Sequence, residues 1–447
     1  MTDLETRAAP RESALRRAAP ALLGYAAVRA LGLLALALWS AARDKSAYTL
    51  LTARWDSLWY TRVAELGYGY EVRLPNGDVH SNLAFFPLLP WLERGLAAVS
   101  PLSAADAGFV VSLLASLAAA WGVFAVADHV YGRRAGVCAA LVWAVLPVGI
   151  VQSMAYSESP FTALAAWALY AVLTGRWVLA GTLASLAGLT RPVGLAVVAA
   201  VWAVGIVAFR RERAAAATPS PGPERTGASA PSSGRERSAA RADGASAGER
   251  APAPAIAARD GRTTPADGAH IPTGAPLSDG GRPLARALGM LLAPLGAAAY
   301  VLWVGHRTGK GPLGYLDVQA GWRNGFDGGY AFARFVGEKF ASFPSALAGV
   351  GLIIGVGLVV WLYVVGVRQR QPLPLVVYAG VVTALALCAS SYFGSKPRLL
   401  LPAFPLLFPL ALALARLRTS RAVLVVGGVA VASAVYGAFW LNGSGPP

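Results

Sequence analysis

The feature that most constrains this chain is a series of long apolar runs separated by short polar stretches rich in arginine. Runs of about 20 apolar residues match the hydrocarbon thickness of a bilayer, and no soluble domain needs so many of them. Hydrophobic residues make up 56% of the chain and charged residues only 14%, and the mean hydropathy is +0.52. The pattern predicts an all-α polytopic membrane protein whose first partner is the lipid bilayer.

The positions of the arginines predict the side of the membrane on which each polar stretch lies. A formal net charge of +16 would suggest nucleic acid in a soluble protein, but here basic residues recur at alternate ends of the runs, which is the positive-inside pattern. We therefore expect no nucleic-acid partner, a cytoplasmic N-terminus (residues 1–20) and an extracytoplasmic C-terminus. The clusters expected to face the cytoplasm are residues 133–134, Arg176, and residues 210–213, 368–370 and 416–418.

The same alternation gives about eleven transmembrane helices. The first run, residues 21–41, carries Arg29, whose guanidinium we expect to snorkel to the near surface. Residues 85–100 are apolar but short, and a crossing there would place Arg133 outside, so we expect a juxtamembrane or re-entrant helix. The other expected spans are residues 106–128, 135–151, 157–174, 177–189, 193–209, 284–305, 343–367, 374–392, 399–415 and 422–441.

These runs divide the chain into an N-terminal transmembrane module, residues 21–209, and a C-terminal one, residues 283–447. Residues 210–282 between them contain no aromatic residue and are dominated by Ala, Pro, Gly, Ser, Thr and charged residues. Such a segment cannot bury enough apolar surface to offset its chain entropy, so we expect a disordered cytoplasmic insert without a catalytic role. Cys138 and Cys388 both lie in apolar runs, which indicates neither a disulfide framework nor a thiolate metal site.

The stretch richest in functional signals lies in and just after the first expected outer loop, residues 42–84. Between Arg54 and Pro90 it reads RWDSLWYTRVAELGYGYEVRLPNGDVHSNLAFFPLLP. Long ordered loops are usually functional. Aromatic rings can stack on sugars, carboxylates accept hydrogen bonds from hydroxyls, and arginine binds phosphate. An interfacial aromatic belt is the alternative explanation, and composition alone favours neither.

The order R-W-D-x-x-x-Y-x-x-x-A-E-x-G-Y, followed by N-L-A-F-F-P-L-L-P, resembles the PIG-V-like family. Its best-known member is the second mannosyltransferase of GPI-anchor assembly, a GT-C-type enzyme that uses a polyprenyl-phosphate sugar. The resemblance implies a GT-C-type bundle with a long first extracytoplasmic loop that contains juxtamembrane helices. Its specific motifs lie between Arg54 and Gly194, and the cytoplasmic insert has no family counterpart.

The resemblance also implies roles for two acidic residues. Asp56 would be the general base, because the GT-C superfamily places its acidic residue in this first outer loop. The residues alone allow Asp56 equally to be a structural partner of Arg54. Glu158, in Ala-Tyr-Ser-Glu-Ser, would bind the acceptor or support the base, although a carboxylate at a helix N-terminus often only complements the dipole.

Basic and aromatic residues complete the expected substrate site. Arg191 begins R-P-V-G, which keeps the Arg and Gly of a family pattern close to R-S-N-G but lacks its Ser-Asn pair. The remaining expected substrate contacts are Arg54, Trp55, Tyr60, Lys396 and Arg398. Asp317 and Trp322 match a family segment only loosely, and His80 is expected at the surface. No cluster has metal-ligand spacing, so we expect no cofactor, with a divalent metal left open.

The predicted function is therefore an inverting glycosyltransferase of the cell membrane. It would transfer a hexose, with mannose the first candidate, from a polyprenyl-phosphate sugar to an extracytoplasmic lipoglycan, wall polymer or protein acceptor. Two other classes stay open. A transporter or flippase of a lipid-linked or sugar substrate would place ionisable residues and broken helices near the midplane, and a scaffold subunit would have no activity.

Overall fold

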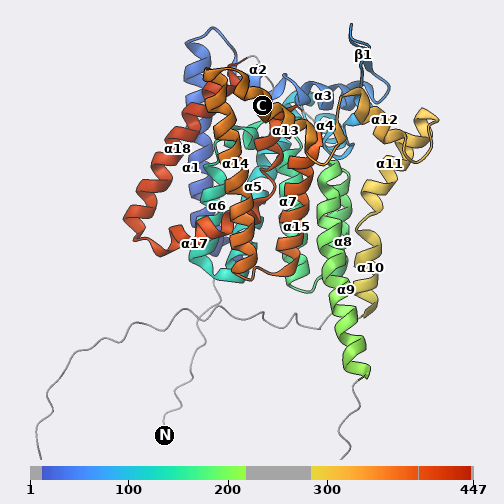
Figure 1. The fold of residues 1–447 in the computed structure, drawn as a ribbon, viewed down its shortest axis with the longest axis vertical. Coiled ribbons are helices and arrows are strands. Elements are labelled where there is room, and N and C mark those ends of the chain that lie inside the picture. The colour runs from blue at the N-terminus through green and yellow to red at the C-terminus, as the bar shows by residue number, and fades with distance from the viewer. Residues whose placement is uncertain (1–12, 218–282, 391, 444–447) are drawn as a thin grey trace, which may run out of the picture. The chain divides into compact units, whose positions relative to one another are not determined.

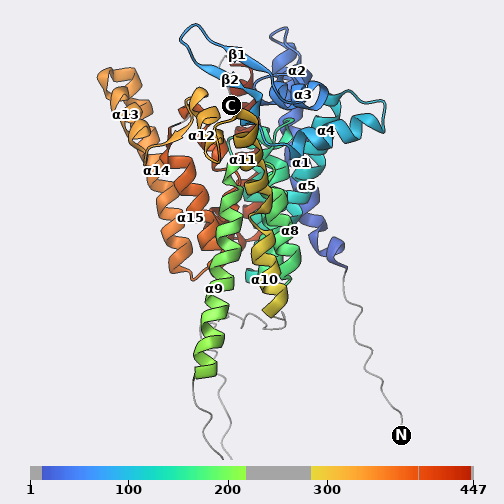
Figure 2. The same ribbon diagram turned by 90° about the vertical axis from the view of Figure 1, so that its right-hand side faces the viewer.

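A computed structural model describes residues 13–217, 283–390 and 392–443, and these residues are mostly helical (Figures 1 and 2). Contacts divide the chain into two compact units, Met1–Phe209 with Gly274–Pro447, and Arg210–Thr273. Only residues 210–217 of the second unit are described, so the fold below is that of the first unit. The predicted disordered insert lies outside the described residues from position 218 onward.

The helices follow the predicted apolar runs closely. Those of the N-terminal module are α1 (Ala14–Ala41), α2 (Ala47–Thr52), α3 (Asp56–Leu66), α4 (Leu88–Ala98), α5 (Ala104–Tyr131), α6 (Arg133–Ala144), α7 (Glu158–Leu173), α8 (Trp177–Gly188) and α9 (Leu195–Ala217). Those of the C-terminal module are α10 (Pro283–Leu292), α11 (Leu295–Thr308), α12 (Gly314–Gly321), α13 (Tyr330–Glu338), α14 (Phe343–Arg368), α15 (Leu373–Cys388), α16 (Lys396–Leu399), α17 (Phe408–Arg416) and α18 (Thr419–Leu441).

Short elements join these helices. The 3-10 turns are η1 (Asn82–Ala84), η2 (Gly149–Ser153), η3 (Pro192–Gly194), η4 (Lys339–Ala341), η5 (Phe393–Ser395) and η6 (Phe404–Leu407). The strands are β1 (Glu71–Arg73), β2 (Val79–Ser81), β3 (Gly325–Phe326) and β4 (Ala389–Ser390), which pair antiparallel as β1–β2 and β3–β4.

Within the described ranges, six helices are long and apolar enough to cross a membrane. They are α1, α5, Pro192–Ala215, Pro283–Thr308, α14 and α18. A seventh results if the bent pair Phe393–Leu399 and Phe404–Arg416 is counted as one span, and α8 and α15 are shorter apolar helices. The structure is therefore that of a helical multi-pass membrane protein.

Several helix ends differ from the prediction. The span expected over residues 135–151 is interrupted, because α6 ends at Ala144 and the short turn η2 follows at Gly149–Ser153. The expected continuous span over residues 399–415 is wrong, because the helices on either side of residues 400–403 are bent by 76°. Pro402 lies within this break and Pro397 and Pro405 lie on either side of it, and proline removes backbone donors and clashes with the preceding turn. The predicted boundary at Phe209 is where contacts divide the chain, but α9 continues beyond it through Arg-Arg-Glu-Arg and four alanines to Ala217, because arginine, glutamate and alanine are strong helix formers.

The segment between α1 and α5 forms one end of the bundle together with α12, and we call this the α3 end (Figure 2). It contains α3, the β1–β2 hairpin and α4, and the hairpin was not predicted. The backbone carbonyls of the N-L-A-F-F-P motif are bound by side chains from the C-terminal module. The Tyr300 hydroxyl donates to the carbonyls of Leu83 at 2.9 Å and Phe85 at 2.7 Å, and the Trp322 indole donates to Ser81 at 3.0 Å. The two modules therefore meet on this motif.

The predicted snorkelling of Arg29 is wrong. Its side chain is buried within the bundle at 7% exposure, and its guanidinium donates to the carbonyl oxygens of Ala144 and Gly149. An arginine at this depth is costly unless protein groups replace its hydration. Here the last residue of α6 and the first residue of η2 supply the carbonyls that Arg29 binds, so its side chain stays inside the bundle.

Glu93 of α4 is fully buried against α5, and neither carboxylate oxygen has a hydrogen-bond partner among the described residues. The contact requires Gly108, because a Cβ at that position would lie 2.5 Å from Oε1 of Glu93. Burial, and secondarily the charge of Glu65, raises the pKa of Glu93 well above its usual range. The side chain therefore packs α4 against α5 as a neutral acid.

We expect Glu93→Gln to flatten the dependence of stability on pH. A raised folded-state pKa means that the folded protein binds a proton that the unfolded chain has lost. The parental stability should therefore fall as pH rises above the unfolded pKa of about 4.3 towards the folded pKa. Thermal unfolding of the purified protein across this range measures the effect. Glu71→Gln, at an exposed position on β1, is the control, and equal pH slopes in the parent and Glu93→Gln would contradict the prediction.

Candidate functional site

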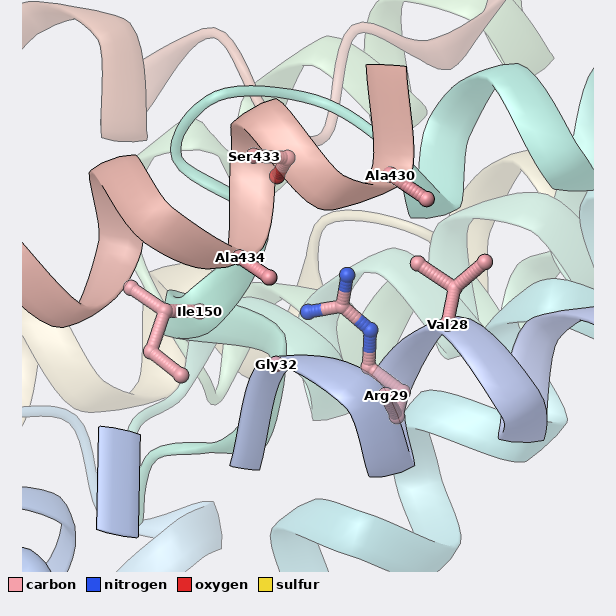
Figure 3. Close-up of a pocket in the computed structure, with 7 residues that line it drawn as sticks. All are labelled: Val28, Arg29, Gly32, Ile150, Ala430, Ser433 and Ala434. Carbon is pink, nitrogen blue, oxygen red and sulfur yellow. The ribbon is translucent and has the colours of Figure 1, made fainter. Parts of the chain in front are cut away.

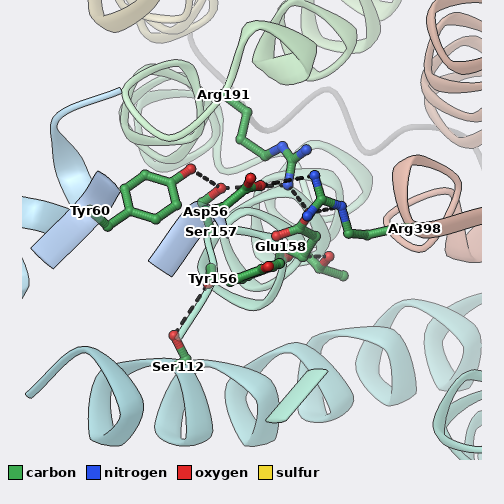
Figure 4. A network of polar contacts seen from close by, with 9 residues as sticks. Asp56, Tyr60, Ser112, Tyr156, Ser157, Glu158, Arg191 and Arg398 are labelled. Carbon is green, nitrogen blue, oxygen red and sulfur yellow. Dashed lines mark hydrogen bonds and ion pairs between the residues drawn. The ribbon is translucent and has the colours of Figure 1, made fainter. Parts of the chain in front are cut away.

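Four charged residues that are far apart in the sequence meet at the α3 end of the bundle (Figure 4). Arg398 of α16 lies between two carboxylates, with Nη2 2.9 Å from Oδ2 of Asp56 and Nε 3.1 Å from Oε1 of Glu158. Arg191, between α8 and η3, also forms an ion pair with Glu158. The structure thus brings together both predicted acidic residues and two of the predicted phosphate-binding arginines.

Local backbone geometry sets the position of Asp56. Trp55, the residue before α3, has φ 52° and ψ −122°, a conformation that a bulky residue rarely adopts. The turn is held by Ser57, whose hydroxyl accepts from the Arg54 N–H at 3.0 Å and donates to the Arg54 carbonyl at 2.7 Å. Backbone strain of this kind concentrates at functional sites because the surrounding structure must hold it in place.

The two carboxylates differ in access. The side chain of Asp56 is 29% exposed, whereas that of Glu158 is only 1% exposed. A substrate that approaches the α3 end therefore reaches Asp56 first. Glu158 is positioned to support the arginines and to accept a hydrogen bond from a group that enters beside Asp56.

The ion pairs of Glu158 are short but poorly aligned. Neither of its oxygens, nor Nε or Nη1 of Arg398, makes a hydrogen bond of acceptable angle within the described part of the chain. The short distances mean that the charges of Glu158, Arg191 and Arg398 offset one another, and the poor angles leave part of their hydrogen-bonding capacity unused. Burial acts to lower the pKa of Arg191, but Glu158 and Tyr60 raise it above its usual value, so this guanidinium stays charged.

Tyr60 and Ser157 link α3 to the start of α7. Tyr60 is buried, and its hydroxyl lies 2.7 Å from the Ser157 hydroxyl, which in turn is 3.5 Å from Nη1 of Arg191. Burial raises the pKa of Tyr60, so its phenol is neutral. Tyr60 therefore lies beside the charged cluster, and its role as a substrate contact stays a prediction.

Two predicted substrate contacts lie elsewhere. The ammonium of Lys396 is bound at the end of α15, where it donates to the carbonyls of Ala386 at 2.8 Å and Ala389 at 2.6 Å. It forms no ion pair with a described carboxylate. The Arg54 guanidinium lies 3.9 Å from the centre of the Trp55 ring, so Arg54 stacks on Trp55, and the ion-pair partner of Asp56 is Arg398.

The sequence analysis did not identify Tyr156 or the aromatic cluster beside Tyr60. The Arg398 guanidinium lies 5.1 Å from the centre of the Tyr156 ring. In the cluster, Trp59 stacks on Phe85 at 5.6 Å and meets Trp322 edge-on at 4.8 Å. The Tyr immediately before Ser-Glu was a usable signal for Tyr156, but no local pattern linked Trp322 to the first loop.

Two other positions were mentioned in the sequence analysis without a firm role. His80 is half-buried and stacks on Trp322 with ring centres 4.1 Å apart, so it packs into the aromatic cluster rather than standing free at the surface. Asp317 is an exposed partner of Lys310 at 3.5 Å. A search of the described residues finds no group of three His, Cys, Asp or Glu side chains that could hold a metal ion.

Comparisons with known proteins add no relative: no family model matches the chain, and neither a curated protein nor a solved structure is significantly similar to it.

We expect Arg398→Gln to destabilise the protein by about 3–5 kcal/mol, because it leaves the buried carboxylate of Glu158 with one cation fewer. The double variant Arg398→Gln/Glu158→Gln should recover part of this loss, since it removes the uncompensated charge as well. Thermal or denaturant unfolding in detergent measures both. The control is Arg323→Gln at the exposed Arg323–Asp78 pair, which should cost about 0–1 kcal/mol. Equal losses for the two single variants would show that Arg398 does not hold the cluster together.

Proposed function

We propose that this chain is a GT-C-type integral membrane glycosyltransferase that takes a hexose from a polyprenyl-phosphate sugar. The acceptor is an extracytoplasmic lipoglycan, wall polymer or protein. One observation carries the proposal: an accessible carboxylate, Asp56, meets two arginines and a buried second carboxylate at one end of the bundle. A base beside fixed cations is what transfer from a lipid phosphate requires.

In the proposed reaction Asp56 takes the proton of the acceptor hydroxyl, and the hydroxyl oxygen attacks the anomeric carbon in line. The bond from that carbon to the phosphate oxygen breaks, and its electron pair leaves with polyprenyl phosphate. The configuration is inverted because a single displacement occurs. Arg398 and Arg191 face the negative charge that grows on the departing phosphate.

The charge balance of the cluster adds a condition to this mechanism. Asp56 and Glu158 together offset the charges of Arg191 and Arg398, so neither arginine stands free for a phosphate in the structure. An incoming phosphate must compete with Asp56 for Arg398, the shared cation. Donor binding then loosens the ion pair of Asp56 and makes its carboxylate available as the base.

The proposed topology comprises about eleven crossings of the cell membrane with the α3 end outside. Shorter helices such as α7, α8 and α15 supply the crossings beyond the six long helices. Support comes from the arginine clusters at the α5–α6, α14–α15 and α17–α18 connections, which lie at the end opposite α3 (Figure 1). The positive-inside rule assigns that end to the cytoplasm.

A transporter or flippase is the second candidate, and two observations favour it. The span that contains Arg398 is broken with a bend of 76°, and Arg29 is buried inside the first span. Broken helices and buried charges are features of transport sites. The two functions separate in detergent solution, where an enzyme turns over a polyprenyl-phosphate sugar and a transporter has no gradient to use.

We expect Asp56→Asn to lower the transfer rate by about 10²–10⁴-fold, because it keeps the shape of the side chain but removes its basicity. Donor binding should persist, and Glu158→Gln should cost less if Glu158 only supports the site. The measurement is turnover per correctly folded molecule with a polyprenyl-phosphate sugar. Asp78→Asn is the matched control, since Asp78 is another aspartate of this loop that pairs with an arginine. Near-parental turnover of Asp56→Asn would remove Asp56 as the base.

The topology is tested by cysteine labelling from outside intact cells, with Cys138 and Cys388 replaced by serine. A cysteine at Asn76, in the exposed turn of the β1–β2 hairpin, should react with a membrane-impermeant maleimide. A cysteine at Arg370, in the α14–α15 connection, should react only after the membrane is permeabilised. The reverse pattern would invert the proposed orientation and move the site to the cytoplasmic side.

A further inference from the structure

The connection between α6 and α7, residues 145–157, is mostly buried non-α-helical backbone that leads directly to Glu158. It contains Pro147 and the short turn η2. Helices satisfy their own carbonyls, but backbone of this kind inside a membrane bundle cannot rely on water. Each buried carbonyl must therefore find a donor from the protein.

Side chains from several helices supply these donors along the connection and at its ends. The pairs are Gln152 to the Trp143 carbonyl at 2.8 Å, Ser433 to Leu146 at 2.7 Å, Ser159 to Gln152 at 3.1 Å and Ser112 to Tyr156 at 3.2 Å. Arg29 alone supplies two of them, to Ala144 at the end of α6 and to Gly149 at the start of η2. It therefore fixes both sides of the point at which α6 breaks.

The Arg29 guanidinium lies among the side chains of Val28, Ile150 and Ala434 (Figure 3). A Cβ on residue 149 would lie 2.8 Å from Nη2 of Arg29, so the approach requires Gly149. No described carboxylate forms an ion pair with Arg29. A cation at the C-terminal end of a helix is also favoured by the helix dipole, which lets the carbonyls of α6 stand in for a counter-ion.

The cavity beside Arg29 excludes a binding role for it. The space lined by Arg29, Ile150 and Ser433 measures about 10 Å³, which is close to the volume that one water molecule needs. A sugar or a lipid phosphate is far larger. This space therefore serves neither candidate function as a ligand site. The guanidinium of Arg29 binds the backbone instead.

We infer that Arg29 is a positioning residue for the candidate site: it fixes the start of the α6–α7 connection and thereby the place of Ser157 and Glu158 at its end. The far end is held separately, by the Ala155 N–H on the Leu51 carbonyl at 3.0 Å and by the Tyr60–Ser157 contact. With both ends of the connection fixed, the carboxylate of Glu158 is held in place to form its ion pairs with Arg191 and Arg398. The inference that this position of Glu158 matters for catalysis rests on the proposed function. The inference that Arg29 fixes the position does not.

The first experiment measures placement without any assay of activity. Ser153 is fully buried in η2, and its hydroxyl has no hydrogen-bond partner in the part of the chain that the structure describes. Ser153→Cys is therefore a reporter in a background with Cys138 and Cys388 replaced by serine. N-ethylmaleimide should react slowly with this cysteine in the parent. With Arg29→Gln the reaction should be about tenfold faster or more, because two charge-assisted hydrogen bonds are lost, and Arg29→Lys should lie between.

Matched variants separate positioning from general loosening of the fold. Arg43→Gln changes an exposed arginine just beyond the end of α1 and should leave the labelling rate unchanged. Should Arg29→Gln fail to fold, Arg29→Lys and Ser433→Ala carry the test, since each weakens the connection by fewer contacts. Parental labelling rates in all the folded variants would overturn the inference.

The second experiment connects placement to chemistry. Folded Arg29→Gln should lose about 10²-fold in kcat, the scale expected when a distant change shifts reacting groups by about 1 Å. Donor KM should change little, and Arg29→Lys should restore part of kcat. Faster labelling with no transfer activity even in the parent would retain the positioning role and reject the glycosyltransferase. Faster labelling with parental kcat would show that the connection does not control the site.

Discussion

Backbone carbonyls that water cannot reach are the constraint on which this structure depends. In regular helices each carbonyl is bound by a backbone N–H of the same helix, which covers most of the chain. The segments that build the site are the ones that depart from a helix. These are the motif around Phe85, the α6–α7 connection and the break that follows Arg398. Each is held by side-chain donors from distant helices: Tyr300 binds the Phe85 carbonyl and Arg29 the Gly149 carbonyl. At the break, Trp143 and Tyr378 donate to the carbonyls of Leu401 and Pro402. Irregular backbone and function thus occur together because non-helical segments can turn side chains inward, provided that donors surround them.

The charged cluster follows a similar logic. A buried charge without a partner destabilises a protein strongly. The ion pair between Glu158 and Arg398 therefore reduces the free-energy cost of burying each of them. Asp56 joins them at the exposed edge, where a strained Trp55 turns the start of α3 towards Arg398. The result is a set of charges that is balanced at rest and that an incoming anion can rearrange. A site of this kind exchanges one ion pair for another, which avoids exposing an isolated charge to the membrane interior.

The sequence was sufficient for the helical character, most helix positions and the pairing of acidic with basic residues at one site. Apolar runs and their arginine-rich ends are local features of the sequence, so they can be recognised without knowledge of the tertiary structure. The errors about individual side chains have a common cause, which is that a partner distant in the chain decides the outcome. Arg29 stays inside because α6 ends beside it, Lys396 is bound by the end of α15, and Tyr156 matters because Arg398 lies over its ring. Periodicity and composition cannot name such partners, and the roles assigned to Asp56 and Glu158 remain predictions.

The origin of Arg398 has a consequence for biosynthesis. Asp56 and Glu158 belong to the module that leaves the ribosome first, whereas the arginine that joins them lies beyond residues 210–282, near the end of the chain. Until that last portion is inserted, the two carboxylates have no common cation and the site is incomplete. A nascent or truncated chain therefore carries the acidic half of the site without the cation that couples it. Assembly of the membrane domain and completion of the charged cluster become a single late event.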